Sequence, residues 1–248
     1  FKQKTAYEIM PSLVGSEMCI RDSYPIVHAS AVSKNDNAFI FSARGGGGKT
    51  TVALALASKG FDFLSDNYSI IHEGKILSFP TSLSIFTYNL VPSVLRSMNN
   101  KERRMILLKK IIYKCTGGYA KFFTKINPRR VFDNIPQSSE LNSVFMLIPH
   151  TNTHKVSITK MSRDELISQM VYNQMLEFPF FNNYIEEYSY FFPMSTFSQS
   201  WSIYKKLLLK NFPENINYHK ILAPMNQKYD ECTINHILNR GDDINASK

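Results

Sequence analysis

The stretch SARGGGGKTT, Ser42 to Thr51, decides the fold expected for this chain. Four consecutive glycines and a Lys-Thr pair match the end of the phosphate-binding pattern G-x-x-x-x-G-K-[ST]. The pattern departs only at its first position, where Ala43 replaces glycine. Alanine is tolerated there unless its φ angle is positive. The expected phosphate cradle consists of Ala43, Arg44, Gly45, Gly46, Gly47, Gly48, Lys49, Thr50 and Thr51.

The sequence on both sides of this loop has the strand-before, helix-after context that a phosphate cradle needs. His28–Val32 and Ala38–Ser42 are strand-like runs separated by a turn-rich stretch, which predicts a hairpin. Thr50–Gly60 favours a helix. Unpaired N–H groups at a helix N-terminus attract phosphate, so we expect Lys49 to reach the β- and γ-phosphates of ATP and the Thr50 hydroxyl to bind Mg²⁺. The alternative is a flexible glycine loop that happens to precede Lys-Thr.

A carboxylate for the metal is expected from the next strand, Phe61–Ile71. The usual second acid after an apolar strand is absent from VFMLI, Val144–Ile148, which ends in Pro149-His150. Asp66 is the nearest good metal carboxylate. Parallel packing of its strand beside the loop strand would bring Asp66 close to Thr50 and the metal.

The rest of the chain mixes strands and helices. Ser162 and Glu165 form a capping-box pattern that starts a helix running to about Glu177. The other expected elements are a strand at Lys75–Phe79, helix from Pro92 to Cys115, a strand pair at Leu141–Ile148 and His154–Met161, and mostly helix from Pro179 to Arg240. Together these elements predict an α/β fold with a helical C-terminal part.

Composition narrows the class of protein. The 248 residues carry a net charge of +9, which favours anionic ligands, although no nucleic-acid motif accompanies the charge. Cys115 and Cys232 make no disulfide framework, so we expect a cytoplasmic protein. No apolar run approaches the ~20 residues of a membrane span. The sequence leaves the oligomeric state open, with a homo-oligomer as one option.

The N-terminal segment, residues 1–23, is expected to be foreign to the protein. Residues 2–8 (KQKTAYE) and 13–22 (LVGSEMCIRD) resemble translated pieces of a transposase-type sequencing adapter. The protein's own sequence is then expected from Tyr24, with a portion upstream missing. We expect a kinase-like domain at 24–177 and a helical extension at 178–248.

The run HASAV…FSARGGGGKTTVALALASKGFDFLSDN, from His28 to Asn67, resembles the C-terminal catalytic domain of HPr kinase/phosphorylase and its wider kin. In that family a His stands fifteen residues before the loop and an acidic pair begins seventeen residues after the loop Lys. Here His28 precedes Ala43 by fifteen and Asp66 follows Lys49 by seventeen. The resemblance covers residues 24–80 and, more faintly, 125–177. It implies a P-loop core of the HPr kinase/phosphoenolpyruvate carboxykinase type, with an antiparallel hairpin before the loop.

The resemblance also implies roles for single residues. Lys49 would hold ATP phosphates, Asp66 would be the general base that deprotonates the acceptor hydroxyl, and His28 would lie near the phosphates; a strand histidine satisfied by its neighbours is the alternative. Asn67 replaces the family's second acid, so it would bind metal weakly and cannot act as a base. The glycine-rich signature of true HPr kinases is not visible, which makes HPr an unlikely substrate.

Three segments outside the loop have alternative interpretations. Lys101–Lys114 holds six basic residues and one acid. It could dock an acidic peptide or a membrane surface, but a helix with a buried apolar stripe is favoured. The aromatic run Phe178–Phe192 could be a recognition or dimer surface, but core of a helical subdomain is favoured. Arg129 and Arg130 either reach phosphate or substrate, or lie on the surface.

The function expected from these residues is ATP- and Mg²⁺-dependent phosphoryl transfer to a hydroxyl on a peptide, a small protein or a metabolite. Ala43 and Asn67 suggest the main alternative, a nucleotide-binding regulatory module with weak or lost catalysis. A transport or motor ATPase is disfavoured because its second acid and further signature loops are missing.

Overall fold

The computed structural model describes residues 24–86, 92–117, 119, 122–150, 156–224 and 234–235, so the expected adapter segment lies outside the described residues. The elements in chain order are β1 (Ile26–Val27), β2 (Ala29–Lys34), β3 (Asn37–Ser42), α2 (Lys49–Ala57), β4 (Asp62–Ser65), β5 (Ser69–His72), β6 (Lys75–Leu77), β7 (Leu83–Phe86), α3 (Pro92–Ser97), α4 (Asn100–Cys115), β8 (Phe123–Ile126), the 3₁₀ turn η1 (Pro128–Arg130), β9 (Ser138–His150), β10 (Ser157–Lys160), α5 (Arg163–Glu177), α6 (Pro179–Phe191), α7 (Ser200–Asn211) and β11 (Asn217–Pro224).

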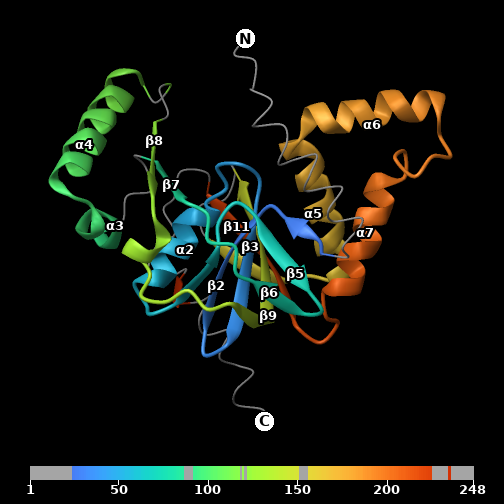
Figure 1. Ribbon diagram of the computed structural model, residues 1–248, viewed down its shortest axis with the longest axis horizontal. Helices are drawn as coiled ribbons and strands as arrows, with labels where there is room; N and C mark the ends of the chain where they lie inside the picture. Colours follow the sequence, from blue (N-terminus) through green and yellow to red (C-terminus); the bar gives the residue numbers. More distant parts are fainter. Residues whose placement is uncertain are drawn as a thin grey trace.

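A large mixed sheet forms the centre of this α/β fold (Figure 1). Its strands follow the order β1-β5-β6-β9-β3-β2-β4, with β11 beside β9 and β10 beside β11. β2 and β3 pair antiparallel, from Ala29↔Ser42 to Lys34↔Asn37. β3 runs parallel to β9. The loop after β3 therefore emerges from the interior of the sheet, where strands on both sides fix its position.

Helices cover both faces of the sheet, because side chains along each central strand alternate between two cores. Phe39 and Phe41 of β3 belong to the core beneath α2. Ala38 and Ile40 of the same strand belong to the core beneath α5 and α7. Figure 1 shows α2 on one side of the sheet and α5 and α7 on the other. The glycine loop begins at the end of β3 and therefore lies between the helix layer of α2 and the helix layer of α5 and α7.

The expected single strand Phe61–Ile71 is wrong, since the segment divides into β4 and β5. Between them Asn67 adopts a left-handed φ of 67°, a conformation that Asn tolerates better than most residues. β4 runs parallel to the loop strand, as expected, but the two are not neighbours, because β2 lies between them and pairs antiparallel with both.

The C-terminal part is not all helical, which corrects a second expectation. β11 inserts between the expected strand partners, running parallel to β9 and antiparallel to β10. Its buried residues include His219, Ile221 and Ala223, an alternation typical of a strand that the sequence analysis missed. Residues 217–224 therefore belong to the main sheet, although they follow the domain boundary expected after residue 177.

The two favoured core assignments in α4 and α6 are wrong as well. Met105, Leu108 and Ile111 of α4 expose half or more of their surface, while Ile106 is the buried residue of this helix. On α6, Phe180 and Tyr184 are exposed and Ile185 is buried. Among the residues that the structure describes, no helix has both the length and the apolar character to cross a membrane.

Candidate functional site

The glycine loop joins β3 to the N-terminus of α2. Gly48 precedes the helix with a φ of 95°, and no side chain caps the first turn, so its N–H groups face outward from the helix end. A Cβ at Gly47 would lie 2.7 Å from Ala43 Cβ and 2.9 Å from the Arg44 carbonyl oxygen. Glycine is thus required at 47 by close packing and at 48 by its backbone angle. The loop has the form of an anion-binding turn at a helix N-terminus.

Ala43 contributes its backbone to this site and its methyl group to the core. The residue is fully buried and is not among the described residues with a positive φ, so alanine is unstrained here. Its carbonyl oxygen accepts hydrogen bonds from Lys49 Nζ at 2.8 Å and from Asn173 Nδ2 at 3.1 Å. Alanine at the first position of the pattern therefore leaves the loop intact and ties it to α5.

Lys49 is a buried cation, with only 6% of its surface exposed. Burial lowers its pKa to about 8, against the opposing effect of the Glu177 and Asp66 carboxylates, which favour the charged form. An ammonium group that is desolvated in this way gains when an anion such as phosphate approaches it.

Asp66 lies against Thr50 at the base of the loop, completely buried. Thr50 Oγ1 lies 3.0 Å from Asp66 Oδ1 and 3.1 Å from Oδ2, and Ser30 Oγ also donates to Oδ1. Burial raises the pKa of the Asp66 carboxyl, and the hydrogen bonds from Ser30 and Thr50 oppose this rise. The carboxylate and the hydroxyl form a pair of oxygen ligands of the type that Mg²⁺ prefers.

Glu177, the last residue of α5, also belongs to this site, although our sequence analysis did not include it. Its Oε1 accepts a hydrogen bond from the Gly45 N–H, and its Oε2 lies 3.7 Å from His28 Nδ1. The capping box predicted where α5 begins, but no local pattern linked the end of that helix to a loop 132 residues away. The loop N–H thus already holds one anionic oxygen atom, supplied by the protein.

His28 stands at the edge of the same group, between Glu177 and Tyr68. Burial, and to a smaller extent the positive charge of Lys49, lower the pKa of His28 to about 3. The ring centroids of His28 and Tyr68 are 6.1 Å apart. His28 is therefore neutral at physiological pH, which suits a hydrogen-bonding role and excludes a cationic one.

The low pKa of His28 predicts a loss of stability in acid. Between pH 6.5 and about 3 the unfolded chain binds a proton at His28 that the folded chain does not. The free energy of unfolding should therefore fall as pH decreases, by about 1.4 kcal/mol per pH unit for this single group. In His28→Gln this contribution disappears, so its urea midpoint should depend less steeply on pH than that of the wild type. Equal slopes for the two proteins would contradict the burial argument.

The remaining predicted residues separate into those inside and those outside this group. Asn67 directly follows Asp66, and Thr51 lies in the first turn of α2. Arg44 and Gly46 are exposed at the loop tip. Arg130 is not part of the site, because its guanidinium pairs with Glu102 of α4 at 2.8 Å on each nitrogen.

No family model matches the chain, and no curated protein matches it. A solved structure of the Hpr(Ser) kinase/phosphatase from Coxiella burnetii is similar with a TM-score of 0.39 and 9% sequence identity, covering 90% of this chain and 95% of that chain. A similarity this distant assigns no activity, which has to be inferred from the residues of the site.

Proposed function

We propose that this chain binds ATP at the glycine loop and transfers the γ-phosphoryl group to a hydroxyl acceptor. The observation that carries the proposal is the convergence of three groups on one helix N-terminus. These are the loop N–H groups, the buried Lys49 cation and the Thr50–Asp66 oxygen pair. Phosphoryl transfer needs positioning and charge neutralisation more than covalent chemistry, and these groups supply both.

The donor set fits the groups that the reaction requires. Gly45 N–H already hydrogen-bonds a carboxylate oxygen of Glu177, which supports an anion-binding role for the loop. Thr50 and Asp66 would hold Mg²⁺, which would neutralise charge on the phosphates. Mg²⁺ in nucleotide sites is commonly bound by one or two protein groups together with substrate phosphates, and this pair is sufficient for that arrangement.

Asp66 is the group we assign as general base. The acceptor hydroxyl would form the new O–P bond, its proton would pass to Asp66, and ADP would leave with the bridging oxygen. Burial raises the pKa of this carboxyl toward the range in which a carboxylate accepts a proton efficiently. Asn67 beside it has no basic oxygen, so Asp66 would carry this role without a second acid.

The direct experiment offers the full chain γ-labelled ATP, Mg²⁺ and a degenerate library of serine- and threonine-containing peptides, with a panel of small alcohols beside it. Label in a peptide or alcohol product, absent without Mg²⁺, is the expected result. Label released only as inorganic phosphate would instead indicate an ATPase. No binding of MgATP by calorimetry would overturn the proposal.

A regulatory nucleotide-binding module remains the second candidate, favoured by Asn67 and by the contact between Glu177 and the loop. Such a module would bind MgATP but transfer nothing to any acceptor. Replacing Asn67 with Asp separates the two functions. If Asn67→Asp transfers phosphate much faster than the wild type, the wild type is an enzyme that has lost part of its catalysis. If the wild type already transfers phosphate and the variant is no faster, the wild type is an enzyme adapted to work with Asn67.

Removal of the Glu177 charge is expected to tighten nucleotide binding. The Glu177 carboxylate and an ATP phosphate would compete for the same loop N–H, and like charges in a partly buried site repel. In Glu177→Gln we expect the Kd for MgATP to fall by about tenfold. Calorimetry at constant salt measures this change. Glu165→Gln, at the opposite end of α5, is the control, and a weaker Kd in Glu177→Gln would show that the carboxylate assists binding instead.

A further inference from the structure

The outer face of α4 carries an apolar stripe that no described element covers. Met105, Leu108, Ile111 and Ile112 are 50%, 54%, 58% and 37% exposed. Their spacing of three and four residues places them along one side of the helix. Ile106, on the opposite side, is 1% exposed and attaches α4 to the core beneath α2. A contiguous exposed apolar patch on a soluble protein usually marks an interaction surface.

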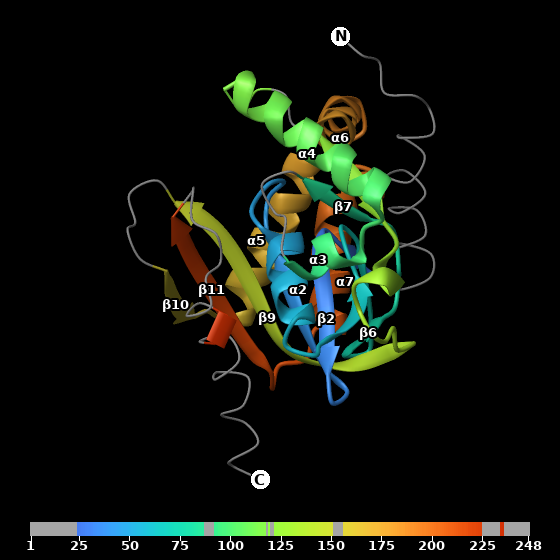
Figure 2. The same ribbon diagram turned by 90° about the vertical axis from the view of Figure 1, so that its left-hand side faces the viewer.

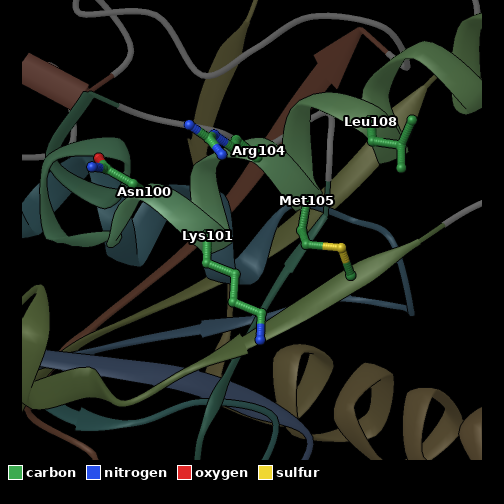
Figure 3. Close-up of a pocket in the computed structure, with 5 residues that line it drawn as sticks. All are labelled: Asn100, Lys101, Arg104, Met105 and Leu108. Carbon is green, nitrogen blue, oxygen red and sulfur yellow. The ribbon is translucent and has the colours of Figure 1, made fainter.

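An open hollow lies against the N-terminal half of the stripe, and Figure 3 draws the side chains that line it. In this view the side chains of Lys101 and Met105 extend to the same side of the helix. The hollow is lined by Asn100, Lys101, Arg104, Met105 and Leu108. Two apolar and two cationic side chains in one hollow suit an aromatic residue accompanied by negative charge.

The cations around the stripe are not neutralised by the part of the chain that the structure describes. Glu102, the one acid of α4, is committed to Arg130. Lys109 Nζ donates to the Phe123 carbonyl oxygen at 2.9 Å and so faces β8. Within the described ranges, no ion pair is formed by four further cations: Lys101, Arg104, Lys110 and Lys114. The face therefore combines apolar area with positive charge that lacks a counterpart.

The complementary surface is present on α6 of the same chain. Phe180, Tyr184 and Phe191 are 68%, 66% and 71% exposed, and Glu187 falls between them at helical spacing. Glu186 is exposed beside Glu187, and no Lys, Arg or His occurs from Pro179 to Phe191. This face is aromatic and acidic, whereas the face of α4 is aliphatic and basic. Opposite charges on apolar faces of similar size favour pairing and disfavour self-pairing of either helix.

The positions of the two helices allow both contacts to form at once. Figures 1 and 2 show α4 and α6 at the same end of the molecule, and Figure 1 shows them on opposite sides of the sheet. Their 16 and 13 residues correspond to about 24 Å and about 20 Å of helix. A two-fold rotation about an axis along the line of sight of Figure 1 would bring these ends together with each α4 opposite the α6 of the other copy.

We propose that the chain forms a two-fold dimer in which α4 of each copy packs against α6 of the other. Aromatic side chains of α6 fill the hollow on α4, and Glu186 and Glu187 approach its cations. The proposal goes beyond phosphoryl transfer and does not depend on it, because none of the interface residues belongs to the loop site.

Charge reversal in the full chain tests this pairing. The double variants Lys101→Glu/Arg104→Glu and Glu186→Lys/Glu187→Lys should each weaken the dimer Kd by at least about tenfold, because like charges then oppose each other at both contacts. An equimolar mixture of the two variants should form a heterodimer, since both of its contacts are again between opposite charges. Light scattering after size exclusion and sedimentation velocity measure the masses, and Lys206→Glu/Lys210→Glu on α7 is the matched control.

Several results would overturn the proposal. A wild-type chain that is monomeric at micromolar concentration, or a dimer that neither double variant weakens, would show that α4 and α6 do not pair. A monomeric wild type that binds vesicles of anionic phospholipid through α4 would make the face a membrane-binding one. Misfolding is distinguished from lost pairing by the mixture, because a misfolded variant cannot recover the dimer when its partner is added.

Discussion

Lys49→Met is expected to weaken MgATP binding and to reduce phosphoryl transfer by at least about 100-fold. The Lys49 side chain is buried beneath the loop, where its charge faces the Glu177 and Asp66 carboxylates. Methionine retains the length and apolar character of the lysine stem but removes the cation. Two carboxylates would then face the phosphates with no ammonium group between them. Calorimetry with MgATP and the labelled-ATP assay measure the two losses.

The matched control for this substitution is Lys59→Met, which removes an exposed cation just beyond the end of α2. Its MgATP binding should equal that of the wild type. In the wild type, binding should also weaken as pH rises above about 8, because Lys49 loses its proton there and phosphate binds the charged form. Lys49→Met should lack this pH dependence. An unchanged Kd in Lys49→Met would show that the glycine loop does not bind phosphate.

The glycine loop and its flanks were predictable from the sequence because the signals are local. The hairpin β2–β3, the loop and the start of α2 lie within 30 residues, and glycine, turn residues and alternation define each part. The proximity of Asp66 to Thr50 was also expected, and the parallel direction of its strand was correct, but direct packing beside the loop strand was wrong. β2 lies between β3 and β4 and pairs antiparallel with both, so β3 and β4 end at the same edge of the sheet, where Ser30 of β2 and Thr50 both donate to Asp66.

Contacts between distant segments could not be read in the same way. β11 joins the sheet beside β9 although more than 60 residues separate their starts, and Glu177 reaches Gly45 across 132 residues. Pairing of this kind depends on the packing of the whole chain and leaves no local pattern. For α4 and α6 the local pattern was present but incomplete as evidence. Its periodicity correctly predicts helices, but it does not show whether the apolar side faces the core or another molecule.

Asp66→Asn is expected to lower phosphoryl transfer by about 10²–10⁴-fold, the range for loss of a general base. Asparagine has the same shape and can still accept hydrogen bonds from Ser30 and Thr50, so the fold should persist. It cannot take the proton of an acceptor hydroxyl. ATP binding measured without Mg²⁺ should change little, because Lys49 and the loop N–H groups remain. The control is Asp62→Asn at the start of β4, the strand that Asp66 follows, whose carboxylate accepts a peripheral hydrogen bond of 3.3 Å from Asn134.

The stability of this variant provides an independent check on the buried carboxyl. Burial raises the pKa of Asp66 above its ordinary value of 3.8, so the charged form is less favourable in the folded chain than in the unfolded chain. The charged form at neutral pH is thus destabilising relative to the unfolded chain, and this penalty is absent in acid, where both states are protonated. Asparagine removes the charge at every pH. Asp66→Asn should therefore show a Tm equal to or above that of the wild type at neutral pH, with the difference vanishing in acid. A catalytic group retained at the expense of stability is expected of an active site, whereas a clear drop in Tm would assign Asp66 to the structure of the loop instead.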